Sequence, residues 1–570
     1  MEKKTKAYIV ILYLIEIVIG IFYVSRFTIP VHSHVDEELY LAMAKSFHYG
    51  HGFMQYGDIL NYKAVLYSCV ISVAYYFYDP EYILFYVRII NVVIMGSAIF
   101  PAYKLADKVI TDRNKAIMAT LLISIVPEMA MTGYIMQEIL YYPLLLWAFY
   151  LMYMDIRTEG VSLYTVFTPV LYMLAFFTKT VGFIFPLLYA GYLLIKSLLS
   201  KKDYLKILIN TMICAVMYLA ESGLINLING GSGSNHYSSQ VTNLFPITFV
   251  TVRCLVVGVL FYAACTFISM GVFAIAVPVR KIREYKESDK EFCLLLICFL
   301  IASIVEIIVL VVYTEHRDFL YPAKYLYRYV FPVFAPLFIL MIEGLDLPVN
   351  NFSSKIGLVI IVRIILFSSI VLLIYYLVAG TDIASGIVDG LLFTTLTNAV
   401  NHVWRYSGIA FAAILLLLSV AMLYLCRKTN AEDYRFNFKM VISLYAIYFI
   451  VFDIINFVQL PYYSNVICNG NLNEKQFIEI ARWLNSNEHD TVIYVCSGHE
   501  PENSLWGYIR DDYSIYTYEE YISECDNKEI EDESVIIVDK NSAKKYALEF
   551  EEELYSTNDY WIMLYRKNGL

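Results

Sequence analysis

The chain has 570 residues, of which 59% are hydrophobic and 16% are charged, and its mean hydropathy is +0.59. Soluble proteins average about 45–50% apolar and about 25% charged residues, so the composition excludes a soluble protein and predicts a polytopic membrane protein. The net charge of −10 comes mainly from acids near the C-terminus, which argues against a nucleic-acid partner. The ten cysteines occur singly, without the spacing of a metal site or of a disulfide framework.

Apolar runs long enough to cross a bilayer recur along the chain. They predict thirteen spans near 7–27, 82–103, 116–134, 138–154, 161–178, 181–198, 205–227, 246–277, 291–312, 328–343, 356–378, 408–426 and 439–460. Lys and Arg gather in alternate connections, for example 104–115 and 280–290. Because basic loops stay in the cytoplasm, the pattern predicts a multi-pass protein of the cell membrane, with its N-terminus in the cytoplasm and its C-terminal part outside.

Residues 62–78 are also apolar enough to resemble a span. Counting them as one would place the later lysine-rich loops outside, and the segment carries Lys63 and several tyrosines, which favour the interface. We therefore expect a helix lying on the outer surface, within an outer first loop of residues 28–81.

The tail changes character near residue 465. Residues 474–487 have helical periodicity, and strand-like runs follow at 491–496, 535–538 and 560–565. The predicted fold is therefore an α-helical polytopic membrane bundle over residues 1–464, followed by a small extracytoplasmic α/β domain over residues 465–570.

Two acids stand at the start of the first outer loop, in the run HVDEELY from His34 to Tyr40. Charge so close to hydrocarbon is costly, so Asp36 and Glu37 are predicted to do chemistry, such as taking a proton from an acceptor hydroxyl. Asp36 and Tyr40 are one helical turn apart and share a face. The alternative is that both acids stabilise the positive N-terminal end of a surface helix.

Other charged residues fall at the same predicted face. They are Lys63, Arg88 in the second span, Glu138 at the head of the fourth, Lys179 in the turn FFTKTVGF, and Arg317, Lys324 and Arg328 before the tenth. Such cations would hold a lipid-linked phosphate while a carboxylate acts as general base. The structural alternatives are that Glu138 pairs with Arg88 or Lys63, and that Lys63 and Lys324 are ordinary interfacial lysines.

His32, His34, His48 and His51 cluster in the first outer loop. Their spacing does not place them at i and i+4 on one helix, as a helical metal site would need. No metal and no other cofactor is predicted.

Taken together, these residues resemble the GT-C membrane glycosyltransferases, in particular the group that contains protein O-mannosyltransferases and lipid A aminoarabinose transferases (glycosyltransferase families 39 and 83). The matching elements, in chain order, are Asp36-Glu37-x-x-Tyr40, Gly50-x-Gly52, Tyr62-Lys63-x-x-Leu66-Tyr67, Arg88 with Asn91, Glu138, Thr178-Lys179-x-x-Gly182 and Arg328-Tyr329-x-x-Pro332-x-x-x-Pro336. Ala64 and Val65 stand where that group has two prolines, which argues for an acceptor other than theirs.

The resemblance implies an inverting transfer of a sugar from a polyprenyl-phosphate donor to a hydroxyl of a glycan, lipid or protein at the outer membrane face. It implies catalytic roles for Asp36, Glu37 and Glu138. It implies substrate-binding roles for Tyr40, Lys63, Arg88, Lys179, Arg317, Lys324, Arg328 and Tyr329.

Two other functions stay open. A transporter or flippase of lipid-linked sugars would need charges near the bilayer midplane, and Glu306 and Asp453 lie inside predicted spans. A polymerase or ligase of whole glycan chains would use similar outer loops, and only a test of donors separates it from a transferase of single sugars.

Overall fold

The computed structural model describes most of the first 229 residues and selected segments of the rest. The described ranges are 2–27, 35–55, 58–60, 62–77, 82–200, 204–229, 290–314, 331–344, 438–462, 474–487, 493–496, 515–517, 535–540, 552–557 and 560–564, with isolated positions between 363 and 417.

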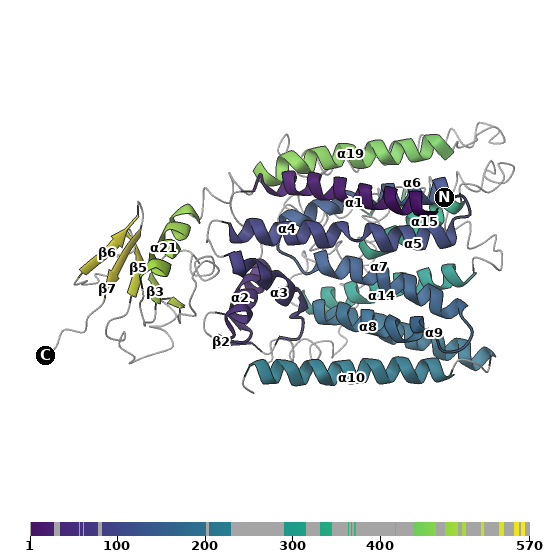
Figure 1. The fold of residues 1–570 in the computed structure, drawn as a ribbon, viewed down its shortest axis with the longest axis horizontal. Helices are drawn as coiled ribbons and strands as arrows, with labels where there is room; N and C mark the ends of the chain where they lie inside the picture. Colours follow the sequence, from purple (N-terminus) through teal and green to yellow (C-terminus); the bar gives the residue numbers. More distant parts are fainter. Residues whose placement is uncertain are drawn as a thin grey trace.

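Long apolar helices run side by side and form a bundle (Figure 1). In chain order they are α1 (Glu2–Val24), α4 (Ile83–Gly96), α5 (Ile99–Val109), α6 (Arg113–Ser124), α7 (Glu138–Arg157), α8 (Leu163–Thr178), α9 (Ile184–Ser200), α10 (Tyr204–Ile228), α14 (Lys290–Thr314), α15 (Phe334–Gly344) and α19 (Phe438–Tyr462). Short 3-10 helices precede three of them: η2 (Pro127–Gly133), η3 (Thr180–Phe183) and η6 (Phe331–Val333).

Five segments of the described chain are long and apolar enough to cross a membrane, so the protein is a multi-pass membrane protein. They are Thr5–Val24, Ile83–Val109, Glu138–Arg157, Thr180–Leu198 and Tyr204–Ile228, close to five of the predicted spans. The total of thirteen stays a prediction, because 246–277 and nearly all of 356–378 and 408–426 lie outside the described residues.

The prediction of one continuous span over residues 116–134 is wrong. Helix α6 ends at Ser124, and the chain continues as η2 from Pro127. Proline has no N–H to donate to the preceding turn and disfavours helix at the residue before it. The consequence is a short irregular segment ahead of α7, whose backbone groups become available to other side chains.

Helix α7 lies centrally and gives the bundle two ends. Asp155 follows Glu138 by seventeen residues, which is about 26 Å at the helical rise and close to the bilayer core of about 30 Å. We call the end that carries Glu138 the α2 end, because α2 (Val35–Tyr49) lies there (Figure 1). We call the opposite end the Asp155 end.

The segment predicted to lie on the membrane surface is too short to cross. It forms α3 (Leu66–Ile71) and η1 (Ser72–Phe77), about 21 Å in all. Its tyrosines and small residues pack onto α2, and Tyr75 donates its hydroxyl hydrogen to the Leu41 carbonyl at 3.3 Å. A two-stranded ribbon, β1 (Met54–Gln55) with β2 (Asp58–Ile59), links α2 to this segment.

The C-terminal part contains α21 (Glu474–Ser486) and a mixed sheet. The strands are β3 (Ile493–Cys496), β4 (Ile515–Thr517), β5 (Val535–Asp539), β6 (Glu552–Ser556) and β7 (Tyr560–Leu564), in the order β4-β3-β5-β7-β6. Strand β3 pairs parallel with β4 and β5, while β7 pairs antiparallel with β5 and β6. The helix and three of these strands match the predicted runs, and the sheet lies beyond the α2 end (Figure 1). Its standing as a separate extracytoplasmic domain from residue 465 stays a prediction.

Candidate active site

The predicted acids lie in the first turn of α2. Asp36, Glu37 and Glu38 all fall there, where the positive end of the helix dipole favours negative charge. Glu37 is 2% exposed, and its Oε1 accepts a hydrogen bond of 2.8 Å from the Ile135 N–H. Glu37 therefore fastens α2 to the segment between η2 and α7, while Asp36, in the same turn, is only partly buried.

A hydrogen-bonded chain runs from α3 through α4 to this same segment. The Tyr67 hydroxyl donates to Asn91 Oδ1 at 3.0 Å, and Asn91 Nδ2 donates to the Tyr134 carbonyl at 2.8 Å. Burial raises the pKa of the Tyr67 hydroxyl well above its usual value, and the nearby carboxylates of Glu37 and Glu138 add to the rise. Tyr67 is therefore a protonated donor within electrostatic reach of both acids.

Tyr40, for which a substrate-binding role was expected, packs against Tyr67. Tyr40 is buried, and its ring meets that of Tyr67 edge to face with centroids 5.7 Å apart. This contact joins Tyr40 to the hydrogen-bonded chain of Tyr67, Asn91 and Tyr134.

Arg88 is buried inside α4 with 1% exposure. Its Nε donates to the Gly133 carbonyl at 2.9 Å, and its guanidinium lies over the Phe27 ring at 4.9 Å. This carbonyl is available because helix α6 stops before Pro127 and Gly133 belongs to the short helix η2. The expectation that a charge inside a span needs a partner is met by backbone and by an aromatic ring.

The structure brings two predicted site residues from different helices into one ion pair. Glu138, in the first turn of α7, contacts Lys179, which follows the last residue of α8. Both side chains are buried, and Lys179 Nζ also lies 5.8 Å from the centroid of Tyr141. Glu138 thus has a structural partner, as one alternative foresaw, but the partner is Lys179.

Lys63 lies between the head of α7 and α10. Gln137 Nε2 donates to the Ala64 carbonyl at 2.9 Å and contacts the Tyr62 hydroxyl at 3.4 Å, so both neighbours of Lys63 are held beside Glu138. Lys63 Nζ donates to the Tyr218 hydroxyl at 2.5 Å and lies 4.3 Å from the centroid of that ring.

The remaining predicted residues lie outside the described chain: Arg317, Lys324, Arg328 and Tyr329, together with His32 and His34. Phe331 of η6 stacks on Tyr142 of α7 with ring centroids 4.1 Å apart, and Tyr142 is one helical turn from Glu138.

The described histidines do not form a metal site. His48 packs edge-on against the Tyr76 ring at 4.5 Å, and burial lowers its pKa. Within the described residues, no three histidine, cysteine or carboxylate side chains gather as metal ligands would.

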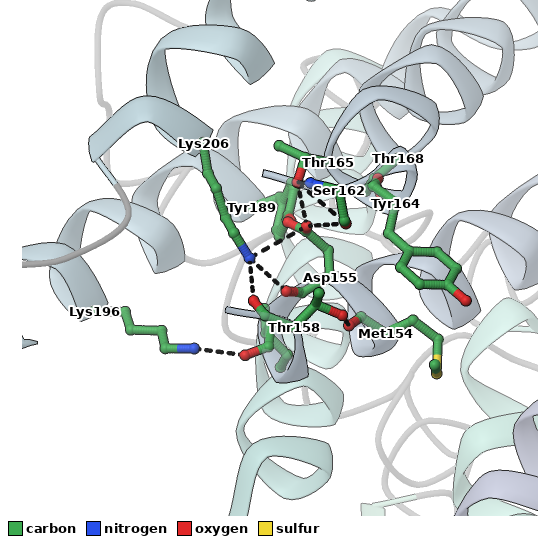
Figure 2. Close-up of polar contacts among 11 residues, drawn as sticks. Met154, Asp155, Thr158, Ser162, Tyr164, Thr165, Thr168, Tyr189, Lys196 and Lys206 are labelled. Carbon is green, nitrogen blue, oxygen red and sulfur yellow. Dashed lines mark hydrogen bonds and ion pairs between the residues drawn. The ribbon is translucent and has the colours of Figure 1, made fainter. Parts of the chain in front are cut away.

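A second polar cluster occupies the Asp155 end and was not predicted as a site. Figure 2 shows Asp155 facing Lys206 of α10, with Nζ 3.3 Å from Oδ1. Lys206 Nζ also donates to the carbonyls of Asp155 and Thr158, at 2.6 and 2.7 Å. Thr165 of α8 donates to Asp155 Oδ1 at 2.5 Å, and the Tyr189 hydroxyl of α9 donates to Oδ2. This one carboxylate therefore ties four helices together, and its partners are all groups of the chain itself.

The sequence reasoning missed the polar residues that hold the α2 end together. Gln137 could have been noticed, because a second polar side chain beside Glu138 at the head of an apolar run needs a partner. Glu221 carried the same signal, because it is an acid inside the predicted span 205–227, and it was overlooked. Tyr218 of α10 and Asn229, directly after α10, carry no such signal.

Comparison with solved structures reveals membrane proteins of the same architecture. ArnT from Cupriavidus metallidurans, bound to undecaprenyl phosphate, aligns with 97% of this chain and 97% of its own, at 15% identity and a TM-score of 0.53. The same protein in its apo state aligns over 98% of both chains, at 13% identity and a TM-score of 0.56.

The chain shares the ArnT fold. ArnT is a lipid A aminoarabinose transferase of the GT-C group, so the resemblance found in the sequence motifs is confirmed at the level of the fold. The archaeal oligosaccharyltransferase AglB from Archaeoglobus fulgidus also aligns, over 94% of this chain and 70% of its own, at 13% identity and a TM-score of 0.43. No protein-family model and no curated protein matches the sequence.

Proposed function

We propose that the protein is a membrane glycosyltransferase that moves a sugar from a polyprenyl-phosphate donor to a hydroxyl acceptor at the extracytoplasmic face, with inversion at the anomeric carbon. The observation that carries the proposal is the gathering at the α2 end of the acids of α2 with Lys63, Arg88 and the Glu138–Lys179 pair. The ArnT fold supports it, as does the undecaprenyl phosphate bound to ArnT.

Asp36 is the proposed general base. Glu37 is buried and accepts the Ile135 N–H, so its task is to hold α2 in place, while the partly buried Asp36 in the same turn receives the acceptor proton. The acceptor oxygen attacks the anomeric carbon, the bond from that carbon to the phosphate oxygen breaks, and the leaving polyprenyl phosphate takes the bonding electron pair.

The cations have the complementary task. Negative charge grows on the phosphate as the bond breaks, and fixed positive groups stabilise that growth more than they stabilise the ground state. Lys63 is the least buried of the predicted substrate-binding cations that the structure describes, so we assign it to direct contact with the phosphate. Arg88 and Lys179 are buried, so we assign them to stabilising the phosphate charge electrostatically without direct contact. Arg317, Lys324, Arg328 and Tyr329 stay predictions.

The orientation in the membrane follows from charge. Lys196 and Lys206 lie at the Asp155 end (Figure 2), as does Arg157 in the last turn of α7. Basic residues favour the cytoplasmic side. We therefore place the α2 end outside, where it would meet a lipid-linked sugar that has already crossed the membrane.

The deciding experiment compares donors. Full-length protein is reconstituted in vesicles and given either a polyprenyl-monophosphate sugar or a diphosphate-linked glycan, and the configuration of the product linkage is determined by NMR. Transfer of a single sugar from the monophosphate donor with inversion, unchanged by EDTA, is the expected result. Transfer only from the diphosphate-linked glycan would indicate the polymerase or ligase function. Movement of either lipid across the bilayer without transfer would indicate a flippase.

A further inference from the structure

Helix α10 carries an acid that the proposed chemistry does not use. Glu221 stands in a run of apolar residues, is 7% exposed, and neither of its carboxylate oxygens has a hydrogen-bond partner among the residues that the structure describes. A buried carboxylate in a span is costly unless a positive charge balances it. The ammonium of Lys63 lies within electrostatic reach and offsets part of that cost.

Tyr218 contacts Lys63 and lies on the same helix as Glu221. It lies three residues before Glu221, on the same face of α10, and it both accepts the hydrogen bond from Lys63 and places its ring beneath the ammonium. Its ring also approaches Phe176 of α8, with centroids 6.2 Å apart. Lys63 is thus held on Tyr218, attracted by Glu221 but without an ion-pair contact to it in the described region.

The spacing between Lys63 and Glu221 is set by tertiary contacts. Asn229, two turns beyond Glu221, accepts a hydrogen bond from the Phe53 N–H at 2.9 Å and donates to the Leu60 carbonyl at 2.8 Å. These two bonds attach the end of α10 to the ribbon that leads to Lys63. Lys63 and Glu221 are therefore held near each other both by the contact of Lys63 with Tyr218 and by the hydrogen bonds of Asn229.

We propose that Glu221 is a competing anion, a positioning residue that holds the Lys63 ammonium on α10 between turnovers and gives it up to the phosphate of a polyprenyl lipid. This inference rests on the proposed function, which assigns Lys63 to the lipid phosphate. The Glu138–Lys179 pair provides the contrast: there the ions touch directly and both are buried, whereas Lys63 is half-buried and attracted from a distance.

The competition has a purpose in the catalytic cycle. When the sugar leaves, the donor phosphodiester becomes a phosphomonoester with a second ionisable oxygen, so the product attracts Lys63 more strongly than the donor does. Product release then becomes slow unless another anion takes the ammonium back. Glu221 supplies that anion and lowers the affinity for every phosphate, most of all for the product.

A competing anion and a merely structural residue at position 221 predict opposite changes in the affinity for undecaprenyl phosphate. Glu221→Gln removes the competing charge, so undecaprenyl phosphate should bind about fivefold to twentyfold more tightly, as expected for one charge partly shielded from water. The same variant should show stronger inhibition of transfer by undecaprenyl phosphate and a lower kcat. A substitution that only disturbed packing would weaken binding.

The experiment measures the affinity of full-length protein in detergent for undecaprenyl phosphate, with inorganic phosphate as a separate arm. It compares the wild type with Glu221→Gln, Lys63→Ala, the double variant of these two, and Glu16→Gln. Lys63→Ala should weaken binding, and in that background Glu221→Gln should have no further effect. Glu16→Gln is the matched control. Glu16 of α1 is another acid in a span, its oxygens have no hydrogen-bond partner within the described part of the chain, and it lies against α4 at Gly96. Its affinity should equal that of the wild type.

The outcomes separate the two proposals. Unchanged or weaker binding by Glu221→Gln, or tighter binding that persists in the Lys63→Ala background, would overturn the role of Glu221 and leave the transferase proposal standing. If the wild type fails to bind undecaprenyl phosphate, or binds inorganic phosphate equally well, both proposals fall, since the site would then not recognise a lipid phosphate.

Discussion

Helix α7 has a buried carboxylate near each end, and the surroundings of the two differ in kind. Asp155 receives hydrogen bonds from Thr165 and Tyr189 and an ion contact from Lys206, and Lys206 in turn donates to two backbone carbonyls (Figure 2). Around Glu138 the charges are spread over α2, α4, the segment before α3, and the end of α8, and each cation has a different kind of partner.

This difference distinguishes buried polar groups that hold helices together from buried polar groups that can serve a reaction. Helices in a membrane gain little from the hydrophobic effect, so a compact buried network such as that of Asp155 specifies how four helices meet. At the α2 end Arg88 donates to a backbone carbonyl and lies over the ring of Phe27. Lys63 donates to a tyrosine hydroxyl, and Lys179 forms an ion pair with a carboxylate. Positive charge held in several such ways can be redistributed when an anion enters, whereas the Asp155 network is complete in itself.

The largest effect on transfer is expected at Asp36. Asp36→Asn keeps the size of the side chain and removes the base, so the rate of transfer should fall by about 10²–10⁴-fold, measured as initial rates with saturating donor. Glu38→Gln changes the charge of the same helical turn equally and should keep most of the activity. A rate for Asp36→Asn within threefold or so of the wild type would show that α2 carries its acids for helix stability alone.

The largest effect on stability is expected at the Asp155 end. Lys206→Met leaves the Asp155 carboxylate buried without its cation, which should lower the free energy of unfolding by about 3–5 kcal/mol, measured by denaturant unfolding in detergent. Transfer per folded molecule should not change. The double variant Asp155→Leu with Lys206→Met should recover part of the loss, because no isolated charge then remains. If Lys206→Met instead loses transfer but keeps its stability, the Asp155 end takes part in function and the two ends do not differ in the way described above.

The sequence predicted the positions of most charged residues better than their pairings. Asp36, Glu37, Arg88, Glu138 and Lys179 were expected at one face. The structure has Asp36 in the same helical turn as Glu37, Arg88 bonded to Gly133, and Glu138 paired with Lys179; their roles in a site stay predictions. A hydropathy profile identifies an apolar helix but does not show which of its side chains face a neighbouring helix.

That is why the pairing of Lys206 with Asp155 was not foreseen from the sequence and Glu221 was passed over altogether. The irregular segment after α6 was missed for the opposite reason. Pro127 was visible as a signal, but the apolar residues around it resembled a continuing span. Only the tertiary structure reveals that the Gly133 carbonyl and the Ile135 N–H serve Arg88 and Glu37.

The next effect tests whether the ion pair at the α2 end resembles that at the Asp155 end. Lys179→Met removes one of the proposed phosphate-stabilising cations and should lower kcat by about 10²-fold, with the donor KM less affected. Glu138→Gln frees Lys179 from its partner and should reduce activity less. If Lys179→Met instead reproduces Lys206→Met, with stability lost and kcat per folded molecule kept, the Glu138–Lys179 pair belongs with the structural network.

The smallest effect concerns the attachment of the first outer loop to α10. Gly52 has a φ of +90°, and a Cβ there would lie 2.8 Å from Asn229 Oδ1 and 3.1 Å from the Ile228 carbonyl oxygen. Gly52→Ala should therefore cost about 1–3 kcal/mol of local strain and loosen the contact that holds Lys63 near α10, which would raise the donor KM severalfold. Gly160→Ala provides the matched control, because Gly160 also has positive φ, 69°, but its Cβ would meet nothing within 4 Å, and it lies in the turn after α7 at the Asp155 end. Both variants carry the backbone strain, so only a difference between their KM values reports the contact with Asn229. Equal KM values would mean that the ribbon and α10 position Lys63 independently of each other.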